Sequence, residues 1–188
     1  MKDAVSAATA ATVASAILNS HPRNVPDSVL DKLKANGGVV MVNFYPAYVV
    51  GDTRAWSVRR AAEKARIDAS HIGDPAGAKA ELAGWDKANP SPTGSLTDVA
   101  DHLDYIAKRI GTDHVGLGGD IDGIESTVKG LEDVSRYPAL FTELARRGWS
   151  EADLRKLSNG NVLRVMKAAE AYAAAHKADA PIENAVTF

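Results

Sequence analysis

The sequence has no cysteine among its 188 residues. Disulfide bonds and thiolate metal ligands are therefore excluded, and any metal ion would have to be held by His, Asp or Glu side chains. No apolar run reaches the roughly 20 residues that a membrane-spanning helix needs. An excess of one charge is also lacking, since 22 basic and 24 acidic residues are intermixed and give a net charge of −2. Nucleic acids and membrane surfaces are therefore poor partners for this chain.

The start of the chain is rich in alanine but lacks the basic beginning and the apolar centre of a signal peptide. We interpret this segment as part of the mature protein, and as written the chain would stay in the cytoplasm. The length suits one globular domain with its own core. We expect a single domain over residues 1–188, with a loose tail at residues 178–188.

Helix and strand patterns alternate along the chain, which is typical of an α/β protein with parallel strands. Apolar runs predict strands at residues 39–44 and 114–119. The first run is continuously apolar or β-branched over most of its length, as in a strand that is buried on both faces. The alanine-rich, charged stretch at residues 52–89 predicts a helical insertion laid over the body of the domain and broken at residues 73–77.

Amphipathic patterns predict further helices over residues 26–36, 137–148, 149–157 and 161–177. The side chains expected to face the core are Val29, Leu30 and Leu33 in the first helix and Val162, Val165, Met166 and Ala169 in the last. Gly37 follows the first helix, where a left-handed cap is favoured.

Capping boxes mark the starts of two more helical segments. Ser95 and Asp98 have the required spacing ahead of a helix that runs to Ile110, and Ser150 and Asp153 repeat that spacing ahead of the helix at 149–157. Both boxes indicate where a helix begins from local chemistry alone.

The stretch HVGLGGDIDGI, residues 114–124, places Asp120 at the carboxyl end of the second predicted strand. Catalytic side chains lie at that end in barrels of parallel strands, and the two preceding glycines let a ligand or a strand approach the backbone closely. An ordinary turn rich in Gly and Asp explains the same residues equally well. A calcium loop is excluded, because Glu125 stands where that loop needs glycine and Leu131 stands where it needs glutamate.

The histidines do not form a convincing set of metal ligands. His102 and Asp104 are two residues apart, but on a helix they point to nearly opposite sides and cannot clasp one ion. We expect each histidine to be an ordinary surface or loop residue: His21, His71, His102, His114 and His176. A catalytic zinc ion needs about three protein ligands. We therefore predict no metal ligand in this chain.

Six blocks of the sequence closely resemble the carboxyl-terminal part of the membrane (renal-type) dipeptidases. In order, they are SHPRNVPDSVL, VVMVNFYPAYV, DVADHLDYIAKRIG, HVGLGGDIDGI, GLEDVSRYP and NGNVLRVMKAAE. They cover nearly everything from Ser20 to Glu170. The resemblance implies an α/β fold in which this chain supplies a partial (β/α)8 TIM-type barrel, namely its carboxyl-terminal strands and helices. It also implies zinc-dependent hydrolysis of dipeptides, in which two zinc ions activate a bridging hydroxide.

The resemblance assigns roles to three residues. Asp120 matches the family's acid/base aspartate, which would pass a proton to the leaving amine. Arg23 matches the arginine that holds the substrate carboxylate, a task that suits a guanidinium group. Tyr48 lies where the family places an aromatic residue near the substrate. On the residues alone, Arg23 is more simply interpreted as a surface charge beside a helix.

The family's zinc ligands are not matched in this sequence. They are a His-x-Asp pair, a bridging Glu and two His on strands before HPRN. We expect the chain to begin within the helix before the last His-bearing strand, and AATVASAILNSHPRN lacks a His at the expected place. We therefore expect that this chain alone binds no zinc and hydrolyses no dipeptide. Family members are often exported or membrane-anchored, but the elements that do this are not found here.

An incomplete barrel would leave strand edges and an apolar face uncovered. We expect self-association or a missing amino-terminal half to cover them. The alternative function is that of a non-catalytic remnant, which acts as a peptide-binding or assembly module.

Overall fold

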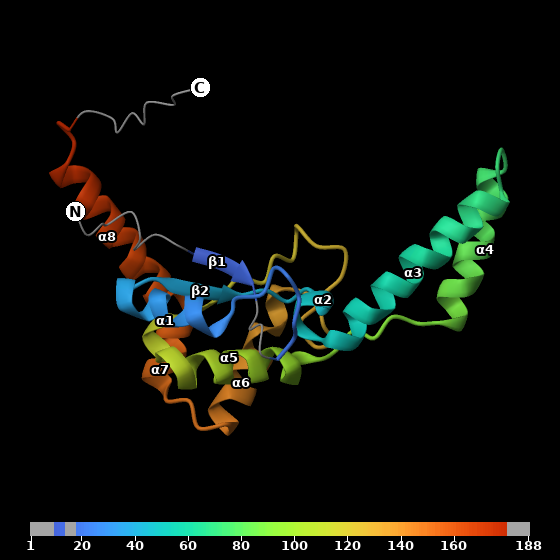
Figure 1. Cartoon of the computed structure of the whole chain (residues 1–188). Coiled ribbons are helices and arrows are strands. Elements are labelled where there is room, and N and C mark those ends of the chain that lie inside the picture. The colour runs from blue at the N-terminus through green and yellow to red at the C-terminus, as the bar shows by residue number, and fades with distance from the viewer. Residues whose placement is uncertain (1–9, 14–17, 180–188) are drawn as a thin grey trace.

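The computed structural model describes residues 10–13 and 18–179 of the chain (Figure 1). The strands are β1 (Ala10–Val13), β2 (Val39–Val42) and β3 (Val115–Leu117). The helices are α1 (Asp27–Asn36), α2 (Pro46–Val49), α3 (Gly51–Ser70), α4 (Pro75–Ala88), α5 (Leu96–Ile110), α6 (Tyr137–Arg146), α7 (Glu151–Arg155) and α8 (Asn161–Ala175). Short turns of other helix types are η2 (Thr112–His114), η3 (Val134–Arg136) and the π-helical η4 (Lys156–Gly160). The chain is thus mostly helical with a small sheet.

The three strands form one parallel sheet in the order β1-β2-β3. This confirms the predicted α/β class. Both predicted strands are shorter than expected. The backbone N–H of Gly118 donates to Val42 at 3.0 Å, so the pairing ends where the Asn43 side chain begins to bond the following turn. At the other end, residues 112–114 form the 3₁₀ turn η2 instead of starting the strand.

One face of the sheet is covered by helices α1 and α5, and α6 packs against α5 (Figure 1). The core between them consists of fully buried aliphatic side chains, among them Leu30, Val42, Leu103, Ile106 and Leu144. Val39 and Val40 point to opposite faces of β2 and are both buried, which confirms the predicted double burial of this strand.

Helix α8 starts beneath the amino ends of β2 and β3. The Asn161 amide donates to the carbonyls of Thr112 and Val115 at 2.7 and 2.8 Å. The Arg164 guanidinium donates to the carbonyl of Gly37 at 2.6 Å. The first turn of α8 therefore closes the end of the sheet opposite Asp120.

Two predicted core side chains are exposed. Val29 is 46% exposed and Met166 is 52% exposed, whereas Leu30 and Val165 on the same helices are buried. The buried face of each helix is narrower than the apolar pattern predicts, because only a narrow stripe of each helix touches the sheet and its neighbours.

The predicted left-handed cap at Gly37, with φ of 79°, and the capping box of Ser95 and Asp98 are confirmed. At the second start, the Ser150 hydroxyl accepts from the backbone N–H of Asp153 at 3.1 Å and donates to the Asp153 carboxylate at 2.6 Å, so Ser150 caps the helix by the first half of the box.

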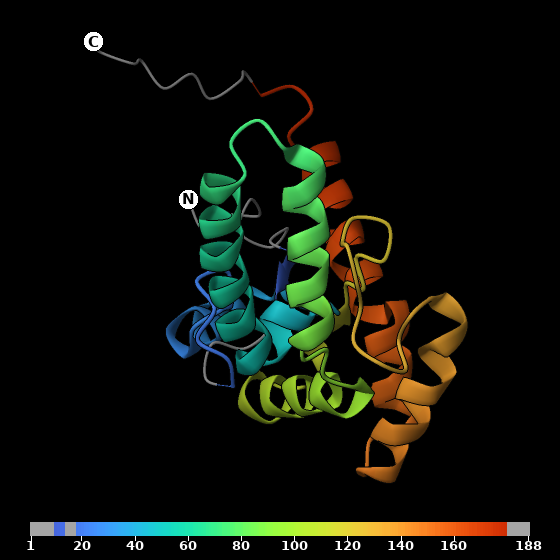
Figure 2. The same ribbon diagram turned by 90° about the vertical axis from the view of Figure 1, so that its right-hand side faces the viewer.

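Helices α3 and α4 lie side by side (Figure 2). Together with the turn between them they form residues 51–88, which we call the arm. The expected helical character is confirmed. The arm extends away from the sheet, however, so the expectation that it covers the body is wrong (Figure 1). The break lies at residues 71–74 and not at 73–77, because α3 ends at Ser70 and α4 begins at Pro75, where the Asp74 side chain accepts from the backbone N–H of Gly77 at 2.9 Å.

Within residues 10–13 and 18–179, none of the helices is long and apolar enough to cross a membrane. The expected start of the chain within a helix and most of the expected loose tail lie outside the described residues.

Candidate active site at the carboxyl edge of the sheet

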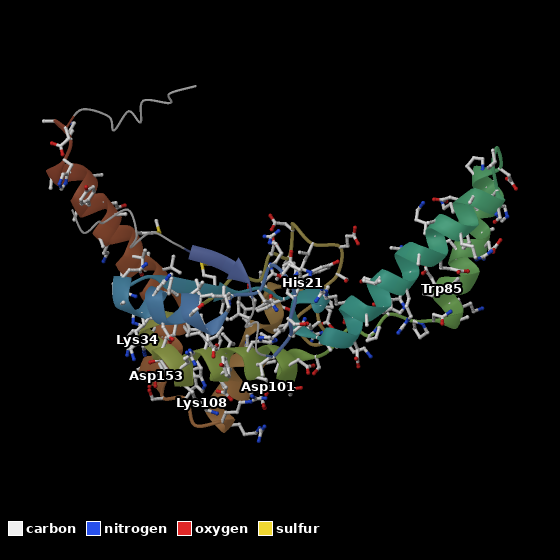
Figure 3. The ribbon with its side chains drawn as sticks, in the orientation of Figure 1. His21, Lys34, Trp85, Asp101, Lys108 and Asp153 are labelled. Atoms are coloured by element: carbon white, nitrogen blue, oxygen red, sulfur yellow. The ribbon has the colours of Figure 1, made fainter. Side chains whose placement is uncertain are left out.

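The loops that follow the three strands gather at one edge of the sheet. Figure 3 shows His21 at the end toward which the β1 arrow points, while Lys34 lies at the opposite end. Asp120 follows β3, Asn43 and Tyr45 follow β2, and His21 follows β1 in the chain. The sequence-predicted residues Asp120, Arg23 and Tyr48 all belong to these loops or to the short helix α2. The structure thus brings all three to the carboxyl edge.

Asp120 has an unusual backbone conformation and a fixed carboxylate. It is the one non-glycine residue with positive φ, at 58°, in the described part of the chain. Its Oδ2 accepts a 3.0 Å hydrogen bond from the Asn43 amide. Asn43 is itself 1% exposed, and its Oδ1 accepts from the backbone N–H of Tyr45 at 2.7 Å. Asp120 itself is exposed. The Asn43 amide that orients its carboxylate is buried and is held in place by its bond to Tyr45.

Gly119, which precedes Asp120, packs closely against two aromatic rings. A Cβ at this position would lie 2.6 Å from the Tyr137 hydroxyl and 3.1 Å from the Phe44 ring. A side chain here would have to displace one of these rings, which meet edge to face with centroids 5.7 Å apart. The glycine before Asp120 is thus required by close packing, as the sequence suggested.

Arg23, Tyr48 and His21 form a second group at this edge. The guanidinium carbon of Arg23 lies 5.7 Å from the centre of the Tyr48 ring, and the His21 ring lies 4.6 Å from that same ring. The backbone N–H of Arg23 donates to His21 Nδ1 at 3.1 Å. Burial first, and then the charges of Arg54 and Arg23, lower the pKa of His21, so this ring is neutral near pH 7.

Two buried asparagines hold the loop of this group against α2. The Asn19 amide donates to the carbonyl of Ala47 at 2.8 Å, and the Asn24 amide donates to the carbonyl of Tyr48 at 2.7 Å. These bonds fix the backbone on both sides of Arg23 while its side chain stays exposed.

Tyr45 connects the two groups. Its ring meets the Tyr48 ring edge to face at 5.1 Å, and its backbone N–H is bound by Asn43, the partner of Asp120. The sequence analysis gave no site role to Asn43 or Tyr45, and it did not predict that the His21 ring packs on Tyr48. A signal was present, because Asn43 is the single amide in an otherwise apolar strand run.

The described residues do not contain a metal site. No group of three or more His, Asp or Glu side chains converges within residues 10–13 and 18–179. His102 is 1% exposed and its Nε2 lies 3.0 Å from the carbonyl of Val49, so the expectation of a surface or loop position is wrong for this residue. His114 lies at the end of β3 opposite Asp120, as predicted, with its Nδ1 2.8 Å from the carbonyl of Gly38.

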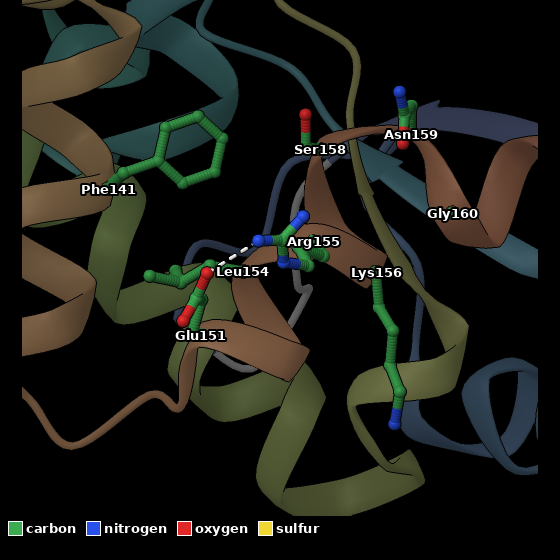
Figure 4. A pocket seen from close by; sticks show the side chains of 8 residues that line it. All are labelled: Phe141, Glu151, Leu154, Arg155, Lys156, Ser158, Asn159 and Gly160. Atoms are coloured by element: carbon green, nitrogen blue, oxygen red, sulfur yellow. Dashed lines mark hydrogen bonds and ion pairs between the residues drawn. The ribbon is translucent and has the colours of Figure 1, made fainter.

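Away from this site, a pocket of about 640 Å³ lies between α6 and α7 (Figure 4). Glu151 and Arg155 form an ion pair of 2.6 Å beside Phe141, and Lys156 points away to pair with Asp113 at 2.8 Å. None of the sequence-predicted site residues lines this pocket.

Two curated relatives align with most of this chain. An uncharacterised dipeptidase of Schizosaccharomyces pombe is 40% identical over 152 residues, which is 80% of this chain and 28% of that protein. The dipeptidase aclJ of Aspergillus oryzae is 37% identical over 166 residues, which is 88% of this chain and 31% of that protein. The chain thus spans less than a third of the length of these curated relatives.

Solved structures share the fold. The probable dipeptidase PvdM from Pseudomonas aeruginosa superposes with a TM-score of 0.67 at 29% identity, over 85% of this chain and 44% of that chain. A metallopeptidase from Rhodobacter sphaeroides superposes with a TM-score of 0.60 at 23% identity, over 84% of this chain and 35% of that chain. Residues 1–180 match the family described as membrane dipeptidase, peptidase family M19. This chain therefore belongs to the membrane dipeptidase family.

Proposed function

We propose that this chain is the carboxyl-terminal part of a zinc-dependent dipeptidase and that Asp120 is its acid/base residue. The observation that carries the proposal is the oriented, exposed carboxylate of Asp120 at the carboxyl edge of the sheet, in a chain that belongs to a dipeptidase family. The metallopeptidase from R. sphaeroides was solved with a phosphinate mimic of the dipeptide L-Ala-D-Ala, which supports a dipeptide as the substrate class.

Asp120 is suited to proton transfer. Asn43 donates to Oδ2 and fixes the plane of the carboxylate, so Oδ1 is available to exchange a proton with the leaving amine of a dipeptide. The left-handed backbone places the side chain at the end of β3 in a conformation that Asp and Asn tolerate better than most residues.

Arg23 and Tyr48 are suited to binding the carboxylate end of the substrate. The Arg23 guanidinium is exposed, and a planar fork of this kind binds a carboxylate with two parallel hydrogen bonds. The Tyr48 ring lies beneath it and restricts where the guanidinium can point. In this proposal the arginine positions the dipeptide and the aspartate acts on the bond that breaks.

The zinc ions of the proposed enzyme require ligands other than the described residues. The carboxylate of Asp120 bonds to an amide, the His21 ring packs on Tyr48, and the His102 ring is directed at a backbone carbonyl. These groups do not converge, so the described residues do not fit a zinc centre by themselves. We expect this chain alone to lack both stoichiometric zinc and hydrolytic activity.

The proposed architecture is a part of a (β/α)8 barrel, formed by a single incomplete domain over residues 1–188 with an insertion at 52–89. Within the described residues, β1 and β3 each have one neighbour and so keep one edge with no strand beside it. Parallel edges of this kind pair with further strands, supplied by an amino-terminal half or by a second copy.

The test is a fusion of this chain behind the segment of the S. pombe dipeptidase that precedes the matched region. We expect the fusion to bind zinc and to hydrolyse L-Ala-D-Ala. The variant Asp120→Asn keeps the shape and the left-handed backbone but cannot exchange the proton. We expect it to lower kcat by about 100-fold or more while zinc content stays unchanged.

The matched control is Asp122→Asn, which removes an exposed carboxylate two residues further along the same loop. We expect it to keep most of the activity. Full hydrolysis by Asp120→Asn in a zinc-loaded fusion would overturn the role of Asp120. A folded fusion that binds zinc and dipeptides but hydrolyses none would instead favour the peptide-binding module.

A further inference from the structure

A cleft of about 660 Å³ opens beside the candidate active site. Its walls come from the end of β2 and α2, from both helices of the arm, and from the loop after β3, which rises beside α2 in Figure 1. Tyr45 belongs both to this cleft and to the chain of contacts that links Asp120 with Tyr48. A substrate held at the carboxyl edge can therefore place one side chain in the cleft.

The cations that line the cleft already have partners. Arg60 forms a two-pronged pair with Asp86, at 2.6 and 2.8 Å. Lys64 pairs with Asp68 at 2.5 Å. Their positive charges are thus neutralised by neighbouring carboxylates.

Two carboxylates act on the Arg60 guanidinium: the hydrogen bond with Asp86 is the first cause that raises the pKa of Arg60, and the charge of Glu125 raises it further. Because Asp86 already forms the ion pair with Arg60, Glu125 is the carboxylate in excess. It lines the cleft and is exposed, and it has no ion pair within the described residues. Its field reaches across the cleft, because burial first, and then the charge of Glu125, raise the pKa of the Tyr45 hydroxyl. The ring of Tyr45 adds an apolar wall that favours a cation, whereas the Trp56 ring is already covered by the Arg60 guanidinium, whose carbon lies 5.8 Å from the ring centre.

We propose that this cleft binds the cationic side chain of a lysine- or arginine-containing dipeptide, with Glu125 as its counter-charge. The inference rests on the proposed function, since it takes the occupant of the neighbouring edge to be a dipeptide. The volume leaves ample room for such a side chain. Glu125 is here a residue that determines specificity and takes no part in the chemical step.

The test measures binding to this chain, so it does not depend on zinc or on hydrolysis. Chemical shift changes in nuclear magnetic resonance spectra give the dissociation constants of L-lysyl-D-alanine and of L-norleucyl-D-alanine, which has a similar length but no side-chain charge. We expect the chain to bind the lysine dipeptide about fivefold to tenfold more tightly.

Three variants locate the preference. Glu125→Gln removes the charge and should bring the two dissociation constants together. Glu125→Lys should reverse the preference, so that L-glutamyl-D-alanine binds better than L-glutaminyl-D-alanine. The matched control Glu132→Gln removes a charge from the same loop outside the cleft and should keep the lysine preference.

Equal binding of the lysine and norleucine dipeptides, or no binding of either, would overturn the proposal. So would a lysine preference that persists in Glu125→Gln. These outcomes are separate from those of the proposed function. If the fusion is inactive but the lysine preference depends on Glu125, the role of the cleft stands and the proposed dipeptidase function is rejected. If the fusion is active but shows no lysine preference, the dipeptidase function stands and the role of the cleft is rejected.

Discussion

The body of the molecule and its arm are both largely helical, but they are stabilised in different ways. In the body, Leu103, Ile106 and Leu144 are fully buried between the sheet and its helices. In the arm, α4 has no buried residue and α3 has a single buried aliphatic side chain, Ile67, which is 1% exposed. The remaining contacts between the two helices include ion pairs such as Arg60–Asp86 and two tryptophans, whose ring centres are 6.0 Å apart.

This difference shows that helical sequence patterns of similar length do not imply similar stability. Burial of a large aliphatic side chain contributes about 1.5–3 kcal/mol, whereas an exposed ion pair contributes about 1 kcal/mol or less. The arm should therefore open more readily than the body, and its stability should depend more strongly on salt, because buried aliphatic side chains stabilise the body in addition to its own ion pairs.

The largest expected effect is in the body. Leu103→Ala should lower the free energy of unfolding by about 2–5 kcal/mol, because it leaves a cavity among fully buried neighbours. Urea denaturation followed by circular dichroism measures this loss. The control is Val58→Ala on the arm, where a 65% exposed side chain is shortened and the change should stay within about 0.5 kcal/mol. Similar losses from both variants would refute the proposed difference.

An intermediate effect should follow from protonation of His102 in the body. Burial, the largest cause, lowers the pKa of His102 below its ordinary value of 6.5, so the folded state holds this ring neutral. The unfolded state binds the proton more readily as the pH falls below about 6.5. The free energy of unfolding should therefore decrease from pH 8 toward pH 5. The contribution of His102 is fully present above the pKa of the unfolded state, about 6.5, and is lost as the pH falls through the lowered pKa of the folded state.

Urea midpoints measured across this pH range test the contribution of His102. His102→Gln should reduce the slope of stability against pH, while the exposed control His176→Gln should leave the slope as it is. His21 contributes in the same direction, so part of the slope should remain. An unchanged slope in His102→Gln would show that this ring does not titrate as the structure indicates.

The smallest expected effect concerns the arm. Raising salt from about 0.05 M to about 1 M should screen its ion pairs and speed amide hydrogen exchange in α3 and α4 by about two- to threefold. Amides of α5 in the body should change less, because this helix is also stabilised by six buried side chains besides its ion pairs. Asp86→Asn removes one partner of the pair with Arg60 and should make the arm less sensitive to salt. Equal salt responses in α4 and α5 would contradict the assignment of the arm to electrostatic contacts.

Local features of the fold could be predicted from the sequence because their causes are local. Gly37 ends α1 since glycine readily adopts positive φ, and Ser95 and Asp98 begin α5 because their side chains satisfy the backbone groups next to them. The position of Asp120 at the end of β3 followed from an apolar run that stops at two glycines.

Features that depend on distant partners could not be predicted. His102 is buried because a carbonyl 53 residues earlier in the chain lies 3.0 Å from its ring. The orientation of Asp120 depends on Asn43, which is 77 residues away in sequence. The arm points away from the sheet because its helices make few contacts with the body, and the sequence pattern of α3 and α4 does not show whether such contacts form.

The turn at the outer end of the arm is a site where the chain should tolerate an insertion. Ile72 is 90% exposed, and a Cβ on Gly73, with φ of 84°, would meet no atom within 4 Å. A fluorescent reporter inserted between these two residues would be separated from the sheet by the length of the arm (Figure 1). The arm therefore provides a place to attach a label while the candidate site and both sheet edges keep their natural sequence.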